Sequence, residues 1–182
     1  MLSDREMYER MANGWRMGMS DGTVCGNGST MANTANVRDW LPQIVETYNI
    51  ASINDAGAGD LHWIKKVQWG RPIAYRAFDL IPRLPSVTAL DITRDVMPAC
   101  DAILCRMVLN HLDEERIVMA LERFRLSARY LIATQFDGEN LPKRSPQFTR
   151  LDLRGAPYFL GDPLGSVQDA VESACTLAIW KL

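Results

Sequence analysis

The chain has 182 residues, 47% of them apolar and 23% charged, which is typical of a soluble globular protein long enough to bury a core. Its formal net charge of -2 provides no basic field for phosphate backbones, so there is no strong signal for nucleic-acid binding. No apolar run is long enough to span a membrane, and residues 1–6 lack an apolar signal core, so we expect a cytoplasmic protein. The four cysteines include no Cys-x-x-Cys pair, and no metal site is predicted.

The first 48 residues are predicted to form a helical extension. Met7, Met11, Trp15 and Met19 recur every four residues within residues 4–19, which gives a helix one apolar face. Such a face is more typical of a docking surface than of a cofactor site. A loop rich in Gly, Ser, Thr and Asn follows, and a second helix is predicted over residues 33–48. Pro42 falls inside this helix, which should kink or restart there.

From residue 50 onward, predicted strands alternate with predicted helices. The strands cover residues 50–54, 73–80, 86–92, 101–107, 130–136, 148–153 and 175–182, and the helices cover residues 61–67, 113–127 and 167–173. This alternation predicts an α/β fold: a Rossmann-like, doubly wound, mostly parallel sheet of six to seven strands with helices on both faces. We expect a single domain over residues 1–182, with an extension and lid at 1–48 and a cofactor-binding core at 49–182.

The turn after the first of these strands reads Asp55-Ala56-Gly57-Ala58-Gly59-Asp60, followed by a predicted helix. Glycines at such a turn let the backbone approach a ligand closely. A dinucleotide fingerprint requires a third glycine where the chain has His62, and no Gly-Lys-Ser/Thr follows to make a phosphate-binding loop. Because Asp55 and Asp60 would repel phosphates, the turn favours a cationic ligand.

The pattern Asp55-x-Gly57-x-Gly59 resembles the first motif of the class I S-adenosylmethionine-dependent methyltransferases. The strings GNGST, WLPQIV, CDAILCRMVLNHLDEERIVMALERF and ARYLIATQF extend the resemblance, from about residue 26 onward, to small bacterial and phage members of that class. The resemblance implies S-adenosylmethionine as the cofactor. It also implies contacts to the cofactor from Asp55, Ala56, Gly57, Gly59, Asp60, Trp63, Cys105, Ser29 and Thr30. Valine at Gly57 or Gly59 is then expected to remove binding while the fold survives.

Two further acids end predicted strands. In the resembling family, an acid at the position of Asp79 accepts hydrogen bonds from the ribose hydroxyls, and a group at the position of Asp91 reads the adenine edge. Either aspartate could instead cap the turn that follows it. Trp63 could likewise be core packing, and the segment from Gly26 to Thr30 could be a surface loop in place of a lid over the cofactor.

The predicted catalytic residues are Arg106 and His111, just beyond the fourth strand of the core. His111 could deprotonate the acceptor or hold its loop through hydrogen bonds, and Arg106 could bind a substrate anion or pair with a nearby acid. The chain lacks the Asp/Asn/Ser-Pro-Pro-aromatic tetrapeptide and the Pro-Cys nucleophile of nucleobase methyltransferases. The resemblance therefore implies methyl transfer to oxygen or nitrogen of a small or polymer-borne acceptor, without the known motifs for nucleobases.

One departure from the resembling family concerns the connection after Asp79. About seven residues, IPRLPSV, precede the third strand, and Pro82 and Pro85 forbid the usual helix. The adenine pocket would then be more open, or would be covered by a partner subunit. Together with the apolar N-terminal face, this departure keeps two rivals open: a non-catalytic protein acting by association, and an enzyme that cleaves S-adenosylmethionine without an acceptor.

Removal of residues 1–20 tests the apolar face. Parallel sheets are normally covered on both sides, so this face would either cover the cofactor site of its own chain or dock on a second copy to form a homodimer. The truncated protein should melt at a lower temperature. It should also bind the cofactor less tightly if the face covers the site, or have the mass of a monomer in solution if the face forms a homodimer. If all three quantities stay unchanged, the segment is only a tail.

Overall fold

The computed structural model describes residues 6, 9, 21–138, 140, 148–169 and 174–182. The apolar face predicted from Met7, Met11, Trp15 and Met19 lies outside these described residues, so its role stays a prediction. None of the helices in the described part of the chain has the length and apolarity that a membrane span needs.

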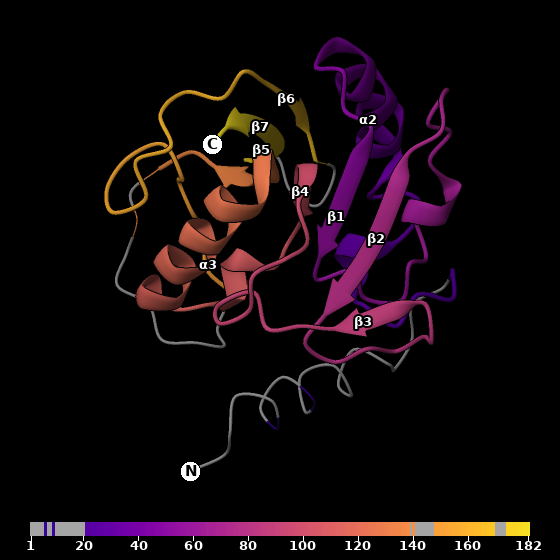
Figure 1. Ribbon diagram of the computed structural model, residues 1–182, viewed down its shortest axis with the longest axis horizontal. Coiled ribbons are helices and arrows are strands. Elements are labelled where there is room, and N and C mark those ends of the chain that lie inside the picture. Colours follow the sequence, from indigo (N-terminus) through magenta and orange to yellow (C-terminus); the bar gives the residue numbers. More distant parts are fainter. Residues whose placement is uncertain (1–5, 7–8, 10–20, 139, 141–147, 170–173) are drawn as a thin grey trace.

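The described elements build one seven-stranded, mostly parallel sheet, as the sequence predicts (Figure 1). The strands are β1 (Ser52–Ala56), β2 (Ala74–Asp79), β3 (Val87–Ala89), β4 (Cys100–Cys105), β5 (Ala128–Phe136), β6 (Gly165–Gln168) and β7 (Cys175–Lys181). Their order across the sheet is β3-β2-β1-β4-β5-β7-β6. β7 pairs antiparallel with both β5 and β6, and the other pairs are parallel. The order reverses between β1 and β4, which makes the carboxyl ends of these strands the expected ligand-binding edge.

Helices cover both faces of the sheet, which is also as predicted. α2 (Ala35–Thr47) packs its apolar residues on one face, against Ile53 of β1 and Leu104 of β4. α3 (Glu114–Ser127) packs on the other face, against Ile103 of β4 and Leu131 of β5. Neighbouring residues of β4 therefore point into opposite cores, as strand geometry requires.

The ends of the two helices follow from local chemistry. Asp113 caps α3 by accepting a hydrogen bond from the backbone N–H of Arg116 at 3.1 Å, and two glutamates occupy the first turn, where the helix dipole favours negative charge. α2 runs through Pro42 without restarting, so the alternative of a second helix start there is wrong.

Three predicted elements differ in the structure. Residues 61–67 form only a short 3-10 turn, η2 (Ile64–Lys66), because Leu61 has a left-handed φ of 58° that is incompatible with a helix start. Residues 148–153 are not a strand, because their backbone bonds are divided between Asn110 and Phe136. The helix predicted over 167–173 is wrong at its start, where Val167 and Gln168 belong to β6 and pair with β7.

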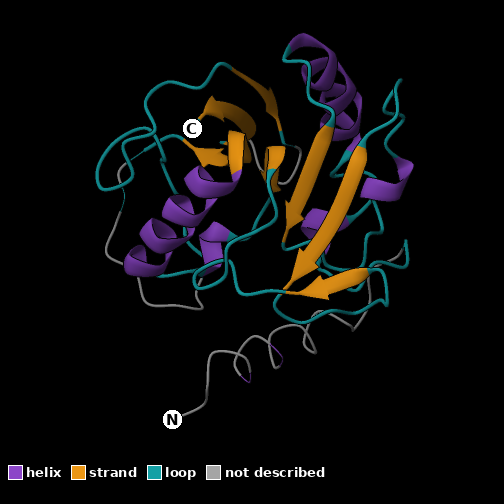
Figure 2. Cartoon of the chain, in the orientation of Figure 1, coloured by secondary structure: helices purple, strands orange, loops and turns teal. Residues whose placement is uncertain are grey.

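The helix after β2 is absent, as Pro82 and Pro85 predict. β2 ends at Asp79 and β3 begins at Val87, and the seven residues between them are turns and loop (Figure 2). The connection from β3 to β4, residues 90–99, also contains no helix, and none was predicted there. Both loops lie at the carboxyl edge of the sheet, where they can form walls around a ligand.

Candidate functional site

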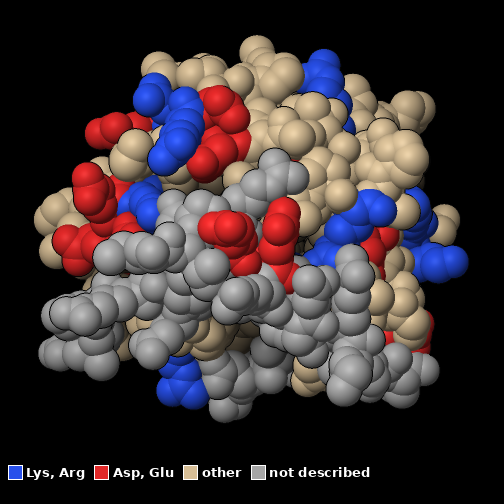
Figure 3. Space-filling model, turned by 90° about the horizontal axis from the view of Figure 1, so that it is seen from below, with Lys and Arg blue, Asp and Glu red and all other residues tan. Residues whose placement is uncertain are grey.

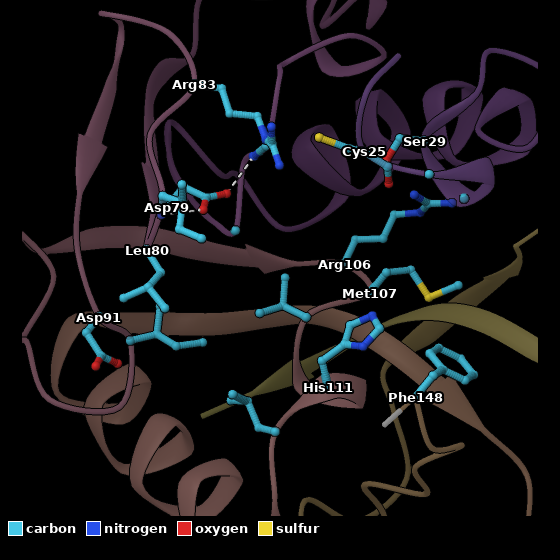
Figure 4. A pocket seen from close by; sticks show the side chains of 18 of the residues that line it. Cys25, Ser29, Asp79, Leu80, Arg83, Asp91, Arg106, Met107, His111 and Phe148 are labelled. Atoms are coloured by element: carbon cyan, nitrogen blue, oxygen red, sulfur yellow. Dashed lines mark hydrogen bonds between the residues drawn. The ribbon is translucent and has the colours of Figure 1, made fainter. Parts of the chain in front are cut away.

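A cavity of about 360 Å³ opens at the carboxyl ends of β1 to β4, where the strand order reverses (Figure 4). This volume lies in the range of small-molecule sites, about 300–1,000 Å³. The cavity is lined by the turn after β1, the loops after β2, β3 and β4, the segment from Cys25 to Ser29, and Phe148. Figure 3 shows that acidic and basic side chains are both exposed on the lower side of the molecule.

Gly57 and Gly59 form the floor of the cavity, and the chain itself requires both glycines. Each has a positive φ, 91° and 59°, that favours glycine. A Cβ on Gly57 would lie 2.2 Å from Cγ2 of Val108, and a Cβ on Gly59 would lie 2.7 Å from Sγ of Cys25. The expectation that valine variants keep the fold is therefore not supported, and these substitutions do not separate ligand binding from folding.

The two acids around this turn face away from the cavity. Asp60 accepts hydrogen bonds from the Thr23 hydroxyl and the Val24 backbone, both at 2.8 Å. Asp55 is buried and accepts a hydrogen bond from the Tyr75 hydroxyl. Neither side chain lines the cavity. The prediction that both acids contact a cationic ligand directly is therefore wrong. Asp60 instead ties the N-terminal segment to the floor.

Burial raises the pKa of Asp55 to about 7, although the Tyr75 hydrogen bond opposes the rise. Asp79 lies close enough to add to the rise, and the Arg106 guanidinium opposes it. Asp55 is therefore a carboxyl group that gains or loses its proton near neutral pH, immediately behind the cavity floor.

Asp79 lines the cavity at the end of β2, and each of its oxygens is anchored by one backbone N–H. Oδ2 accepts from Gly59 and Oδ1 accepts from Ile81, both at 2.9 Å. Burial raises its pKa, against these bonds and the nearby Arg83, whose side chain extends beside it in Figure 4. A carboxylate offers about four lone-pair positions, so two remain for hydroxyl groups of a ligand.

Asp91 also lines the cavity, and it caps its own turn as well. Its Oδ1 accepts from the backbone N–H and the hydroxyl of Thr93, at 2.9 and 2.7 Å. The neighbouring cavity wall is apolar, with side chains from Leu80, Leu90 and Ile92. This end of the cavity suits a flat ring with one polar edge.

The segment from Cys25 to Ser29 lies along the cavity, where the sequence predicts a lid. The 3-10 turn η1 (Asn27–Ser29) belongs to it. Asp21 holds the end of the segment by accepting from the Met31 backbone at 2.6 Å. Ser29 lines the cavity, whereas Thr30 turns inward and donates its hydroxyl to the Asn27 carbonyl at 3.0 Å.

Arg106 lines the cavity and forms a buried ion pair. Pairing with a nearby acid was one of the two roles that the sequence allowed for it. Its Nε and Nη2 donate to the two carboxylate oxygens of Asp169 at 2.7 and 2.8 Å. The guanidinium also lies over the Trp63 ring, 5.4 Å from its centroid. Asp169 is fully buried and comes from the loop after β6, 63 residues away, so nothing in the local sequence marked it.

Met107, His111 and Phe148 define the end of the cavity opposite Asp91 and Leu80 (Figure 4). The rings of His111 and Phe148 meet edge to face, with centroids 5.6 Å apart. Phe148 is held there by Asn110, whose carbonyl accepts from the Thr149 backbone and whose side-chain amide donates to the Thr149 carbonyl. Met107 has a left-handed φ of 58°, a strained conformation of the kind found at functional sites.

Besides Asp55, Asp60 and Thr30, three further residues predicted to contact the cofactor do not line the cavity. Ala56 and Cys105 are fully buried in the core that α3 covers, and burial raises the pKa of the Cys105 thiol. Trp63 packs in the other core beneath Arg106, which is the alternative that the sequence left open. Cavity residues that were not predicted from the sequence include Cys25, Ile81, Arg83, Met107, Val108 and Phe148. Most of these sit within four residues of a strand end or a turn glycine, which is the signal that could have found them.

The structure is similar to solved methyltransferases over nearly its whole length. The 1,6-didemethyltoxoflavin-N1-methyltransferase of Burkholderia thailandensis, solved with its acceptor and S-adenosylhomocysteine, has a TM-score of 0.65 at 13% identity, covering 100% of this chain and 91% of that one. The magnesium protoporphyrin IX methyltransferase of Synechocystis PCC 6803, solved with S-adenosylmethionine, has a TM-score of 0.59 at 15% identity, covering 100% and 99%. A mitomycin 7-O-methyltransferase has a TM-score of 0.55 at 12% identity, covering 99% and 69%.

No model of a known protein family matches the chain, and no curated protein matches it. The similarity therefore lies in structure. The chain has the fold of the class I S-adenosylmethionine-dependent methyltransferases, as the sequence resemblance implies.

Replacement of Asp79 by alanine tests the ribose role. Two hydroxyls that donate to one carboxylate form charge-assisted bonds, each worth about 1.5–3 kcal/mol. Asp79→Ala should therefore weaken S-adenosylmethionine binding at least tenfold by calorimetry, equivalent to ~1.4 kcal/mol. Its melting temperature must be measured alongside, because the variant also frees the N–H groups of Gly59 and Ile81. A smaller loss of affinity in a folded variant would reduce Asp79 to an anchor for two loops.

The raised pKa of Asp55 predicts a pH-dependent loss of stability. The folded-state pKa of about 7 exceeds the ordinary value of 3.8, so the folded protein binds this proton more tightly than the unfolded chain does. Stability from this group then falls as the pH rises from about 4 to about 7, by on the order of a few kcal/mol. Asp55→Asn keeps an acceptor for Tyr75 and cannot ionise, so its melting temperature should rise relative to the parent between pH 4.5 and 8. A constant difference across that range would contradict the raised pKa.

Proposed function

We propose that this protein is an S-adenosylmethionine-dependent methyltransferase that acts on an oxygen or nitrogen atom of a small acceptor. The observation that carries the proposal is the cavity of about 360 Å³ at the strand-order reversal of a class I methyltransferase fold. Two of the similar structures contain S-adenosylhomocysteine or S-adenosylmethionine, and all three are named for small acceptors.

The residues that line the cavity fit this cofactor in their chemistry. Asp79 has acceptor positions left for two hydroxyls, and Leu80, Leu90 and Ile92 offer an apolar wall for a flat base. The cofactor would supply an activated methyl group on a sulfonium. The protein then needs mainly to align the acceptor with that methyl and to exclude water, and alignment alone can supply much of the rate.

His111 is the proposed general base. Its ring lines the cavity at the end where Met107 and Phe148 provide a largely apolar, partly aromatic wall. A general base helps when the attacking atom carries a proton, as a hydroxyl or an ammonium does. Phe148 is 46% exposed, so this end of the cavity is also the end that an acceptor can reach from solvent.

One assay separates this proposal from its rivals. The protein is titrated with S-adenosylmethionine by calorimetry and then incubated with it, with and without a mixture of small phenols, amines and carboxylic acids. Release of S-adenosylhomocysteine only with an acceptor supports methyl transfer. Release of methylthioadenosine or homoserine lactone without an acceptor indicates cofactor cleavage. Binding without any turnover favours a protein that acts by association, and no binding overturns the proposal.

Replacement of His111 by asparagine should lower kcat by on the order of 100-fold or more, because proton removal contributes about 10²–10⁴. Affinity for S-adenosylmethionine should change less than threefold. Phe148→Leu serves as the control, since it alters the same wall without removing a titratable group. If His111→Asn keeps its kcat, the histidine has a structural role through its loop.

A further inference from the structure

Arg106 is held along one edge and one face of its guanidinium. Asp169 occupies the edge of the guanidinium formed by Nε and Nη2, and the Trp63 ring supports its face. Arg106 is only 8% exposed and Asp169 is fully buried, so this pair fixes the guanidinium in one orientation. A buried charge of this kind is costly unless it is well paired, and the bidentate geometry meets that requirement.

The other edge of the guanidinium remains available. Nη1 has no hydrogen-bond partner among the described residues. It is also not fully buried, so a ligand can reach it. Arg106 lines the cavity, and Figure 4 shows its side chain extending toward Ser29. A guanidinium has five N–H donors in two forks, so the fork of Nη1 and Nη2 can receive a second planar anion after Asp169 has taken the first.

We propose that Arg106 is the carboxylate-binding residue of this cavity, with Asp169 as the residue that orients it. A carboxylate matches the planar spacing of the open fork. A phosphate dianion suits it less, because Asp169 already balances the single positive charge and a further acid, Asp55, lies near enough to interact with Arg106. The inference rests on the proposed function, which supplies two sources of a carboxylate: the methionine part of the cofactor and the acceptor.

Two adenosine ligands distinguish these sources. S-adenosylhomocysteine carries the carboxylate, and 5′-methylthioadenosine shares its adenosine and sulfur but lacks the amino-acid part. The parent protein should bind S-adenosylhomocysteine at least tenfold more tightly if the cofactor supplies the carboxylate. Arg106→Lys keeps a positive charge for Asp169 but loses the fork, so it should reduce that preference at least fivefold. Because the preference is a ratio within one variant, a general loss of stability cancels.

Arg83→Lys is the matched control. Arg83 lines the same cavity beside Asp79, next to the part of the ligand that both adenosine probes share. It should change the two affinities by the same factor. If Arg83→Lys changes the preference as much as Arg106→Lys does, the effect is general electrostatics and the assignment to Arg106 is overturned.

Benzoate tests the second source. It is titrated into the parent and into Arg106→Lys, with and without S-adenosylhomocysteine. Loss of benzoate binding in the variant, with an unchanged preference between the adenosine probes, assigns the site to an acceptor carboxylate. No effect of Arg106→Lys on either measurement overturns the proposal. If no adenosine probe binds the parent protein, the proposed function fails, and the benzoate titration without cofactor still decides whether Arg106 binds a carboxylate.

Discussion

The contact of Val108 with Gly57 is the constraint on which the site depends. Parallel pairing places the ends of β1 and β4 at one edge, but side chains would normally keep the loops that follow them apart. Gly57 has no side chain, and Val108 occupies the space where its Cβ would lie, only 2.2 Å away. The loop after β4 can therefore close over the turn after β1. This closure sets the floor of the cavity and directs Arg106, Met107 and His111 around it.

The buried ion pair between Arg106 and Asp169 connects this floor to the far edge of the sheet. β4 and β6 are separated by β5 and β7, so the pair joins loops that the backbone ladder does not connect. Such a pair contributes little net stability, because both charges must leave water, and its observable effect is a fixed side-chain orientation. Trp63 adds to that effect by lying against the guanidinium face. Trp63 was expected to contact the cofactor, but it instead supports Arg106, which lines the cavity.

The fold and the location of the site were predictable because they depend on short-range patterns. Alternating apolar strands, the glycine turn at Gly57 and an acid at the end of β2 fix the sheet and its binding edge. The partners of individual charges were not predictable. Asp55 pairs with Tyr75 and Asp60 pairs with Thr23, so both acids turn away from the cavity that their positions suggested. Phe148 and Asp169 reach the site through loops whose paths depend on tertiary contacts, and no local motif marks them.

The absence of helices after β2 and β3 changes what holds the cavity walls. A helix would satisfy its own backbone and present side chains, whereas a loop at this edge needs partners for its N–H groups. Asp79 supplies a partner for Ile81 in the loop after β2 and for Gly59 in the turn after β1, and Asp91 supplies one for Thr93 in the loop after β3. The same carboxylates line the cavity, so their orientation is fixed by the chain before any ligand arrives. A ligand hydroxyl could then donate to Asp79 without the entropy cost of ordering the carboxylate. Preorganised sites gain affinity in this way. In this chain, the acids expected to contact the ligand therefore also support the loops of the binding edge.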